Sequence, residues 1–307
     1  MRNPNVPESL DGWAILHRMF RLNRRGWDAL GAEQQRAIEH EAVDLFASLA
    51  RDPDTDLGLA QLLGHKGDLM LTHYARSFDA LGEVQARVDK LALRDHLEPF
   101  ESYVSILELG LYEFTAKIHA ELRDRGLKPH SEAWNVAFDA MLEEQAHEPR
   151  NAARLFARIP QRRYACFYPM NKKRDGADNW YATPYDERAK MMLEHGKIGR
   201  LFRGHVTQVI SGSIGFDDWE WGVDLYADDP LVFKKLVYAM RFDEASARFG
   251  EFGRFWTGMQ FSVAELRDRG LKPHSDAWNE AFDAMLDEAA REPRNAARLF
   301  ARIPQRR

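Results

Sequence analysis

The chain has 307 residues, of which 45% are hydrophobic and 30% are charged, and its formal net charge is −5. This length and composition are typical of a protein with a substantial core, built as one large or two small domains. The negative charge argues against a nucleic-acid surface, so any anion site must be a local basic pocket.

The single cysteine, Cys166, excludes an internal disulfide and fits a reducing compartment. Its neighbours Ala165 and Phe167 are apolar, which favours a packed thiol over a nucleophile. No apolar run approaches the ~20 residues of a membrane span, and the N-terminus lacks the apolar core of a signal peptide. We therefore expect a cytoplasmic protein without a membrane span.

The first half of the chain shows the pattern of strands and a helix. Apolar alternation predicts strands over Leu10–Met19, Asp68–His73 and Tyr103–Leu109, and helical spacing predicts a helix over Phe78–Leu91.

A repeated segment follows: Glu121–Arg163 recurs as Glu265–Arg307 with only a few substitutions. Each copy predicts a helical hairpin, with a Ser131 or Ser275 N-cap, an apolar stripe on one helical face, a Glu-Pro break and a short second helix. Two copies do not make a solenoid. The stripes are Trp134, Phe138, Met141 and Leu142 in the first copy, and Trp278, Phe282, Met285 and Leu286 in the second.

The first copy leads directly into the strand that carries Tyr168, whereas the second copy stops at Arg307 and has no counterpart of that tyrosine. The substitutions avoid the apolar stripe; Val136 becomes Glu280 on roughly the opposite face. We interpret the second copy as a tolerated tandem duplication.

The second half repeats the pattern of the first. It predicts, in order, the strand Tyr164–Met170, the strands Thr207–Ser213 and Trp219–Tyr226, the helices Pro230–Met240 and Asp243–Arg248, and the strand Phe255–Phe261. Antiparallel strands with helices on one side indicate an α+β fold.

A further helix precedes His195. Its predicted start has Thr183 as N-cap, Pro184 at the first helical position and Asp186 completing a capping box, and Gly196 is its predicted end. A histidine at a helix C-terminus is explained by the helix dipole alone, so a ligand role needs further support.

Such support comes from the run Tyr164–Arg174, which is followed by Asn179-Trp180-Tyr181. Together with His195, it supplies a phenol, a thioether and a basic cluster beside one imidazole. These groups suit the binding of an anionic macrocycle that surrounds a metal, and the removal of an electron or a hydrogen atom from that macrocycle. Alone the pattern is weak, because tyrosines on strands usually belong to the core or to an interface.

Longer motifs strengthen this interpretation. On their evidence the chain resembles the chlorite dismutase superfamily, and in particular its coproheme decarboxylase branch. The resemblance runs from Leu10 to about Gln260 and excludes the inserted first repeat copy. These motifs are Tyr103-Val104-Ser105, Cys166-Phe167-Tyr168-Pro169-Met170, Asn179-Trp180-Tyr181, Val206-Thr207-Gln208, Phe216-Asp217-Asp218, Glu220-Trp221-Gly222-Val223, Met240-Arg241-Phe242-Asp243-Glu244 and Ser246-Ala247-Arg248-Phe249-Gly250.

The resemblance implies two ferredoxin-like subdomains that form a dimeric α+β barrel within one chain, with haem in the second, and a homopentamer. The duplicated helical hairpins are additions to this fold. The expected segments are an N-terminal subdomain over 1–115, a helical connector over 116–163, a haem-binding subdomain over 164–263 and a helical extension over 264–307.

For the site, the resemblance implies that His195 is the proximal iron ligand, and we consider Glu220 as the acceptor for its second ring nitrogen. Gln208 stands where chlorite dismutases have an arginine. An amide cannot supply that fixed charge, which argues against chlorite chemistry.

The resemblance then implies an enzyme that uses hydrogen peroxide to decarboxylate two propionates of iron coproporphyrin, giving haem b. The substrate acts as its own redox cofactor, and Tyr168 carries the radical that abstracts hydrogen. Lys172 and Trp180 match residues near the second propionate to react, and Met170 is expected beside the porphyrin. Candidates for propionate recognition are Arg154, Arg241, Ser246, Tyr103 and Ser105.

Two other classes remain open. A non-catalytic haem carrier or sensor needs His195 and a basic pocket but not the set Tyr168, Lys172 and Trp180. A haem peroxidase or chlorite-degrading enzyme needs a charged distal group, which Gln208 is not. For Arg154 a purely structural role is also open, because Arg298 occupies the same local sequence without a catalytic strand after it.

Overall fold

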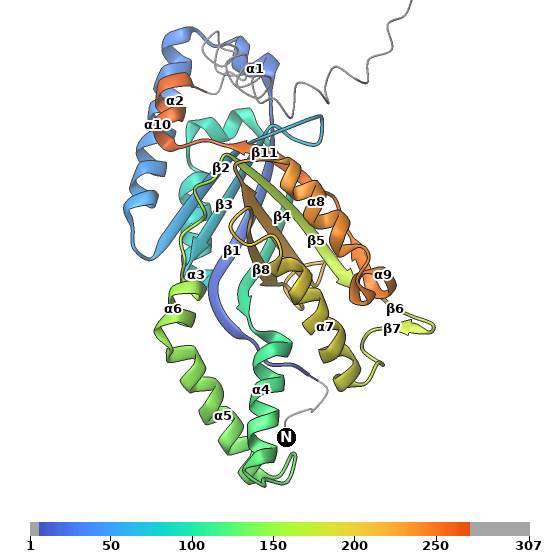
Figure 1. Ribbon diagram of the computed structural model, residues 1–307. Helices are drawn as coiled ribbons and strands as arrows, with labels where there is room; N and C mark the ends of the chain where they lie inside the picture. Colours follow the sequence, from blue (N-terminus) through green and yellow to red (C-terminus); the bar gives the residue numbers. More distant parts are fainter. Residues whose placement is uncertain (1–5, 271–307) are drawn as a thin grey trace, which may run out of the picture.

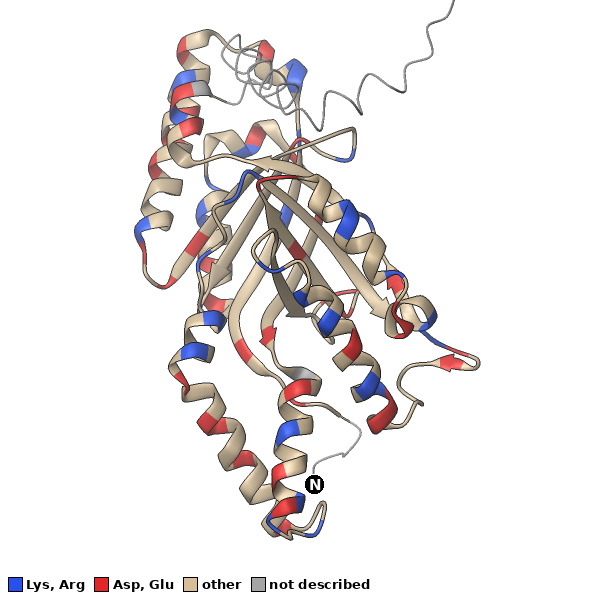
Figure 2. Ribbon diagram, viewed as in Figure 1, with Lys and Arg blue, Asp and Glu red and all other residues tan. Residues whose placement is uncertain are grey.

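The computed structural model describes residues 6–270, which form an antiparallel sheet closed into a barrel, with helices packed on its outside (Figure 1). The predicted Ser275 cap and the stripe of the second repeat copy lie outside the described residues. Lys, Arg, Asp and Glu are intermixed on the helices (Figure 2). None of the helices within residues 6–270 is long and apolar enough to cross a membrane.

The N-terminal half has the ferredoxin-like order of elements. Its strands lie in the order β2-β3-β1-β4, and helices follow the first and third strands. The predicted elements are confirmed, whereas α2 and β2 were not predicted. The elements are β1 (Leu10–Leu22), α1 (Arg24–Asp28), α2 (Ala32–Arg51), β2 (Thr55–Leu62), β3 (Leu69–Ala75), α3 (Phe78–Val88), the 3-10 helix η1 (Ala92–His96) and β4 (Leu97–Leu109).

The C-terminal half repeats this order, with its main strands arranged as β11-β5-β9-β8. A small hairpin, β6 and β7, and a short strand, β10, are added to it. The elements are β5 (Tyr164–Lys172), β6 (Arg174–Asp175), β7 (Asp178–Asn179), α7 (Tyr185–Arg200), β8 (Thr207–Gly212), β9 (Trp221–Ala227), α8 (Leu231–Met240), α9 (Glu244–Phe249), β10 (Gly250–Phe252), β11 (Trp256–Gln260) and, beyond the barrel, α10 (Val263–Arg269).

Two seams join the halves into a barrel. At one seam β4 pairs with β8 through Ile106 and Leu107, and at the other β11 pairs with β2 at Gly258, Met259 and Gln260. All of these pairings are antiparallel, as is the pairing of β5 with β9. Closure leaves these main strands without a free edge and confirms the predicted dimeric α+β barrel.

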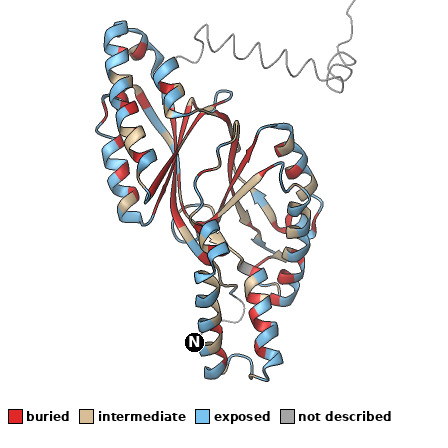
Figure 3. Cartoon of the chain, turned by 60° about the vertical axis from the view of Figure 1, so that its left-hand side comes forward, coloured by how far each residue is buried: buried red, intermediate tan, exposed pale blue. Residues whose placement is uncertain are grey.

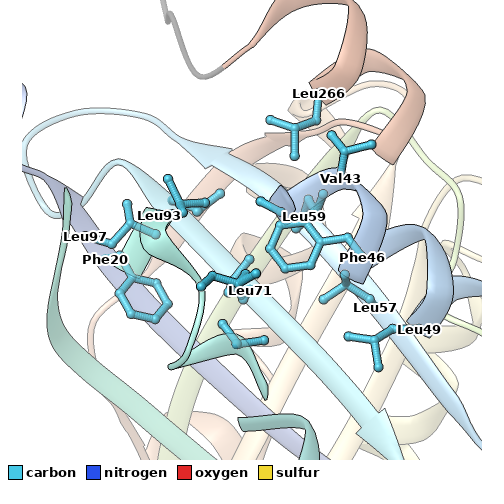
Figure 4. Packing of buried hydrophobic residues seen from close by; sticks show 14 of the residues in the cluster. Phe20, Val43, Phe46, Leu49, Leu57, Leu59, Leu71, Leu93, Leu97 and Leu266 are labelled. Carbon is cyan, nitrogen blue, oxygen red and sulfur yellow. The ribbon is translucent and has the colours of Figure 1, made fainter. Parts of the chain in front are cut away.

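Alternation along each strand separates the barrel interior from its outer face. Tyr103 and Phe167 pack together inside the barrel, where His17 bonds to Asp224 at 2.9 Å. The outer face is buried beneath helices, and the strands are buried along most of their length (Figure 3). One outer cluster lies under α2 and includes Leu266 of α10 (Figure 4). A second lies under α8.

The first repeat copy forms the predicted hairpin, consisting of the end of α4 (Leu111–Asp124), α5 (Glu132–His147) and α6 (Pro149–Leu155). Ser131 caps α5 by accepting from the Trp134 N–H, and Pro149 begins α6. Trp134 and Phe138 are buried against Ile118 and Leu122 of α4. The hairpin thus covers its stripe with the preceding helix.

Candidate functional site

The strand β5 divides its side chains between the two faces of the sheet. Phe167 points into the barrel, whereas Cys166 and Tyr168 lie in the outer cluster with Val223 and Phe233. Burial raises the pKa of Cys166 to about 11. A thiol of this kind is mostly protonated at neutral pH, which agrees with the predicted packed cysteine.

Tyr168 lies in a pocket of aromatic side chains under α8. Only 8% of the residue is exposed, and its ring stacks on Phe255 with 4.3 Å between ring centroids. The Phe252 ring lies 6.0 Å away. Burial raises the pKa of Tyr168 well above its usual value, with a smaller opposing effect from Arg241. The phenol therefore keeps its proton at neutral pH and has a hydrogen to transfer.

Arg241 and Met170 lie beside this tyrosine. The Arg241 guanidinium stacks over the Phe252 ring at 3.9 Å from its centroid, directly after α8 ends. Met170 follows Tyr168 on the same face of β5 and packs on the same cluster. A cation, a thioether and a phenol are thus brought together on the helix-covered face of the C-terminal half.

The hairpin β6–β7 brings Trp180 back over Lys172. Gly176 takes the positive φ of +55° that the turn needs, and the Trp180 N–H donates to the carbonyl of Lys173 at 2.9 Å. Lys172 Nζ lies 4.7 Å from the Trp180 ring centroid and donates to the Ala245 carbonyl at 2.7 Å. The predicted pair is therefore in contact.

Lys172 is 5% exposed, and burial lowers its pKa from 10.5 to about 8, although Asp243 and Glu220 partly oppose this.

This pKa predicts how stability changes with pH. Between pH 8 and 10.5 the unfolded chain binds more protons at Lys172 than the folded chain does, so the contribution of Lys172 to the free energy of unfolding should rise with pH by up to about 3 kcal/mol. Denaturant titrations at pH 8 and pH 10 measure this change in the free energy of unfolding. The Lys172→Met variant should not show the rise, whereas the Lys190→Met variant, substituted at an exposed site, should show it. Equal rises in both variants would contradict the assignment.

His195 is oriented by a carboxylate. Its Nδ1 lies 3.0 Å from Oδ2 of Asp243 and 3.4 Å from Oγ of Ser246. Asp243 is also the N-cap of α9, where it accepts from the Ser246 N–H. Partial burial alone would raise the pKa of Asp243, but the bond from His195 lowers it overall. Because these contacts are made through Nδ1, Nε2 is the ring nitrogen that could serve as a metal ligand, which stays a prediction.

The predicted carboxylate partner of His195 is corrected by this geometry. Glu220 accepts instead from the backbone N–H of Lys172 at 3.0 Å, and Asp243 takes the place expected for it. The helix ends also differ from the prediction. In α7 Pro184 is the N-cap, and the helix continues through Gly196 to Arg200. His195 therefore lies within the helix, where packing of α7 on α9 fixes its direction.

Gln208 lies on β8, and α7 faces it. A Cβ added at Gly199, one turn after His195, would lie 3.5 Å from the Gln208 amide nitrogen. The amide and the imidazole therefore belong to adjoining elements. The roles of both stay predictions.

Arg154 is exposed on α6, near the start of α4. It helps to lower the pKa of Glu113, after the larger effects of Lys117 and Arg200. Because Arg200 is the last residue of α7, Arg154 lies on the same side of the molecule as the His195 helix. Its role in recognising a propionate stays a prediction.

Tyr103 and Ser105 are not brought to the site. They lie on the inner face of β4, where Tyr103 donates to the Trp219 carbonyl at 3.3 Å and packs against Phe167. Ser105 is completely buried, and its hydroxyl has no partner within residues 6–270. The prediction that these two side chains contact propionates is thus not supported by their position inside the barrel.

Sequence reasoning missed an aromatic pair behind Trp180. The Tyr112 ring of α4 lies 6.0 Å from that of Trp180, and the Tyr112 hydroxyl accepts from Arg188 Nη1 at 3.0 Å. The Tyr185 ring stacks on that of Tyr112, with 5.8 Å between ring centroids. The signal in the sequence was the apolar and aromatic start of α4, which follows β4 directly. In the structure this helix packs beside α7.

This donor set fits a haem-type group. It offers one oriented imidazole, an apolar face with Met170 and Tyr168, and the cations Arg241 and Lys172 for carboxylates. Within residues 6–270 no group of three or more His, Cys, Asp or Glu side chains is arranged to hold a metal ion.

Comparison with solved structures gives close agreement over most of the chain. A haem-binding protein from Thermus thermophilus is 38% identical, with a TM-score of 0.73 over 87% of this chain and 98% of that one. Chlorite dismutase from Candidatus Nitrospira defluvii, in complex with imidazole, is 18% identical, with a TM-score of 0.63 over 85% of this chain and 96% of that one. At that lower identity the likeness shows the fold alone.

A family model described as chlorite dismutase matches residues 34–261. The match runs from within α2 to the end of β11, and so leaves out β1, and it includes Tyr168, Lys172, His195, Gln208 and Arg241. The chain therefore belongs to the chlorite dismutase family.

Proposed function

We propose that the protein is a coproheme decarboxylase, which uses hydrogen peroxide to convert two propionates of iron coproporphyrin to vinyl groups and so makes haem b. The observation that carries this proposal is the grouping of a protonated, buried Tyr168 with a buried Lys172–Trp180 pair on the face that His195 adjoins. A binding protein has no need of these three side chains.

Each conversion removes carbon dioxide, two electrons and one proton from a propionate. One peroxide accepts the two electrons and becomes two waters, so the step balances with one further proton taken up. The bound iron porphyrin supplies the redox chemistry. Tyr168, oxidised by one electron and having lost its proton, takes a hydrogen atom from the propionate β-carbon and becomes a phenol again. The carbon radical would then give its second electron to the oxidised porphyrin as carbon dioxide leaves and the vinyl group forms.

The other side chains position the substrate and exclude water. His195 holds the iron from one side, and Asp243 fixes the direction of the imidazole. Arg241 and Lys172 neutralise carboxylates, and the stacked Phe255 keeps the Tyr168 ring in place. Gln208 contributes an uncharged distal amide, which suits peroxide better than an anionic oxidant.

The direct test mixes the purified protein with iron coproporphyrin and peroxide and follows product masses. We expect two successive losses of carbon dioxide, with one peroxide consumed in each. A protein that only binds haem, as the Thermus thermophilus protein is described to do, would bind the porphyrin and leave its mass unchanged. That result would overturn the proposal.

Removing Ala264–Arg307 should leave decarboxylation within a few-fold of the full chain, because the site residues all precede this segment. The truncation should lower the melting temperature, since it removes Leu266, which is 3% exposed in the cluster under α2. The lost burial is worth about 2 kcal/mol. The full-length Leu266→Ala variant is the matched control for stability. Loss of turnover with substrate affinity intact would give the segment a catalytic role.

A further inference from the structure

A cavity of 670 Å³ lies at the end of the barrel where β1, β2 and β11 finish. It is separate from the residues around Tyr168 and His195. Its walls are largely apolar and include Leu22, Leu62, Leu63, Leu97, Met259 and Phe261.

The described chain ends at the rim of this cavity. Leu266 and Gly270 line it, and Leu266 is buried in the cluster under α2 (Figure 4). Gly270 has a φ of +65° and donates its N–H to the Leu266 carbonyl at 2.8 Å. A Cβ at Gly270 would lie 2.5 Å from Oε1 of Glu39 in α2. The point at which residues 271–307 begin is thus held close against α2.

The second repeat copy retains each side chain that the first copy buries. The five substitutions fall at positions 132, 136, 143, 145 and 147 of the first copy, of which only 145 is even half-buried. Val136 is 65% exposed, so Glu280 at the matching position costs no packing. The buried Trp134 and Phe138 recur as Trp278 and Phe282. The second copy therefore carries an apolar stripe that needs a surface to cover it.

The surface that covers the first stripe is not reproduced beside the second. In the first copy the stripe packs on Ile118 and Leu122 of α4. The matching positions are Ser262, the exposed N-cap of α10, and Leu266, which already packs under α2. The second stripe must therefore find another apolar surface, and the cavity at Gly270 is adjacent.

We propose that residues 271–307 dock into this cavity of their own chain, with Trp278 and Phe282 as the anchoring side chains. The place where the described chain ends and the apolar walls support this occupant. The charges of the lining are mixed, because Arg24 pairs with Asp68 and Arg163 with Glu265. The apolar side chains Trp278 and Phe282 are therefore the groups that would fill the cavity. This docking is independent of the decarboxylase proposal.

A thiol placed in the cavity tests the docking in the full chain. The single native Cys166 is buried, so an introduced Leu63→Cys, at a position that is 51% exposed, reacts selectively with a maleimide. The additional substitutions Trp278→Ala and Phe282→Ala remove the proposed anchors, so the segment should leave the cavity more often and the thiol should react faster. We expect labelling to be about tenfold faster, which corresponds to about 1.4 kcal/mol of lost docking free energy. The matched control is Leu231→Cys on α8, 44% exposed, whose labelling should not change. Equal labelling of the Leu63→Cys thiol with and without the two alanines would overturn the proposal.

A short bismaleimide between Leu63→Cys and Met285→Cys distinguishes the occupant. We expect a crosslink within one chain, identified by peptide mass in the monomer band. A crosslink that forms only between chains, in a mixture of the two single variants, would assign the cavity to the segment of a second copy and contradict docking within the chain. Absence of any crosslink, with both thiols reactive, would also overturn it.

Discussion

Tyr168→Phe should bind iron coproporphyrin with nearly unchanged affinity and should form no haem b. The substitution keeps the ring that stacks on Phe255 and removes only the hydroxyl, whose hydrogen the proposed radical step requires. The loss should be large, at least about 10³-fold in rate, or about 4 kcal/mol in the barrier. Porphyrin absorption measures binding, and mass spectrometry of the extracted porphyrin measures turnover.

The matched control for this variant is Tyr103→Phe. Tyr103 is also buried, but it lies inside the barrel, and its hydroxyl donates to the Trp219 carbonyl at 3.3 Å. Its turnover should stay within a few-fold of the unmodified protein. Substantial haem b from Tyr168→Phe would remove Tyr168 from the mechanism, and loss of turnover in Tyr103→Phe would show that the barrel interior takes part.

His195→Ala should abolish the axial bond from the protein to iron, while Arg241 and Lys172 still retain part of the binding to the porphyrin carboxylates. We expect an affinity loss of tenfold or more, which is about 1.4 kcal/mol or more. The spectrum of a five-coordinate histidine complex should disappear. Asp243→Asn should keep the bond but weaken it, because an amide is a poorer acceptor for Nδ1–H than a carboxylate.

His205→Ala is the control for this experiment, since His205 is exposed in the turn after α7. It should leave the spectrum and the affinity unchanged. An unchanged histidine spectrum in His195→Ala would identify a different ligand. An iron–histidine vibration in Asp243→Asn identical to that of the unmodified protein would show that Asp243 does not act through the imidazole.

Much of the fold was predictable because most barrel strands are short runs rich in apolar and aromatic residues, and most of their residues are buried. The miss at β2 has a physical reason: Asp56 and Gly58 are typical of a turn, yet the Asp56 carboxylate is satisfied by the N–H of Ile159 at 2.7 Å. That contact comes from a segment about a hundred residues later. Local sequence does not reveal such a partner.

The site was predictable where residues are neighbours along one element, and less so where they meet across elements. Tyr168, Met170 and Lys172 share one face of β5 by alternation alone. Asp243, the partner of His195, caps another helix, and local sequence does not reveal that contact, so Glu220 was predicted in its place. Alternation in β4 likewise places Tyr103 and Ser105 on one face without saying that this face is the inside of the barrel.

The unequal lengths of the strand pairings have a consequence for motion. β1 and β4 share eleven paired positions, whereas the seams between the halves have only two and three. Local opening should begin where the fewest interstrand bonds are broken, so amide exchange should be fastest along the seams. Tyr168, Lys172, His195, Gln208 and Arg241 all belong to the C-terminal half. Local opening at the seams would therefore admit water to the barrel interior and leave the distances between these side chains unchanged.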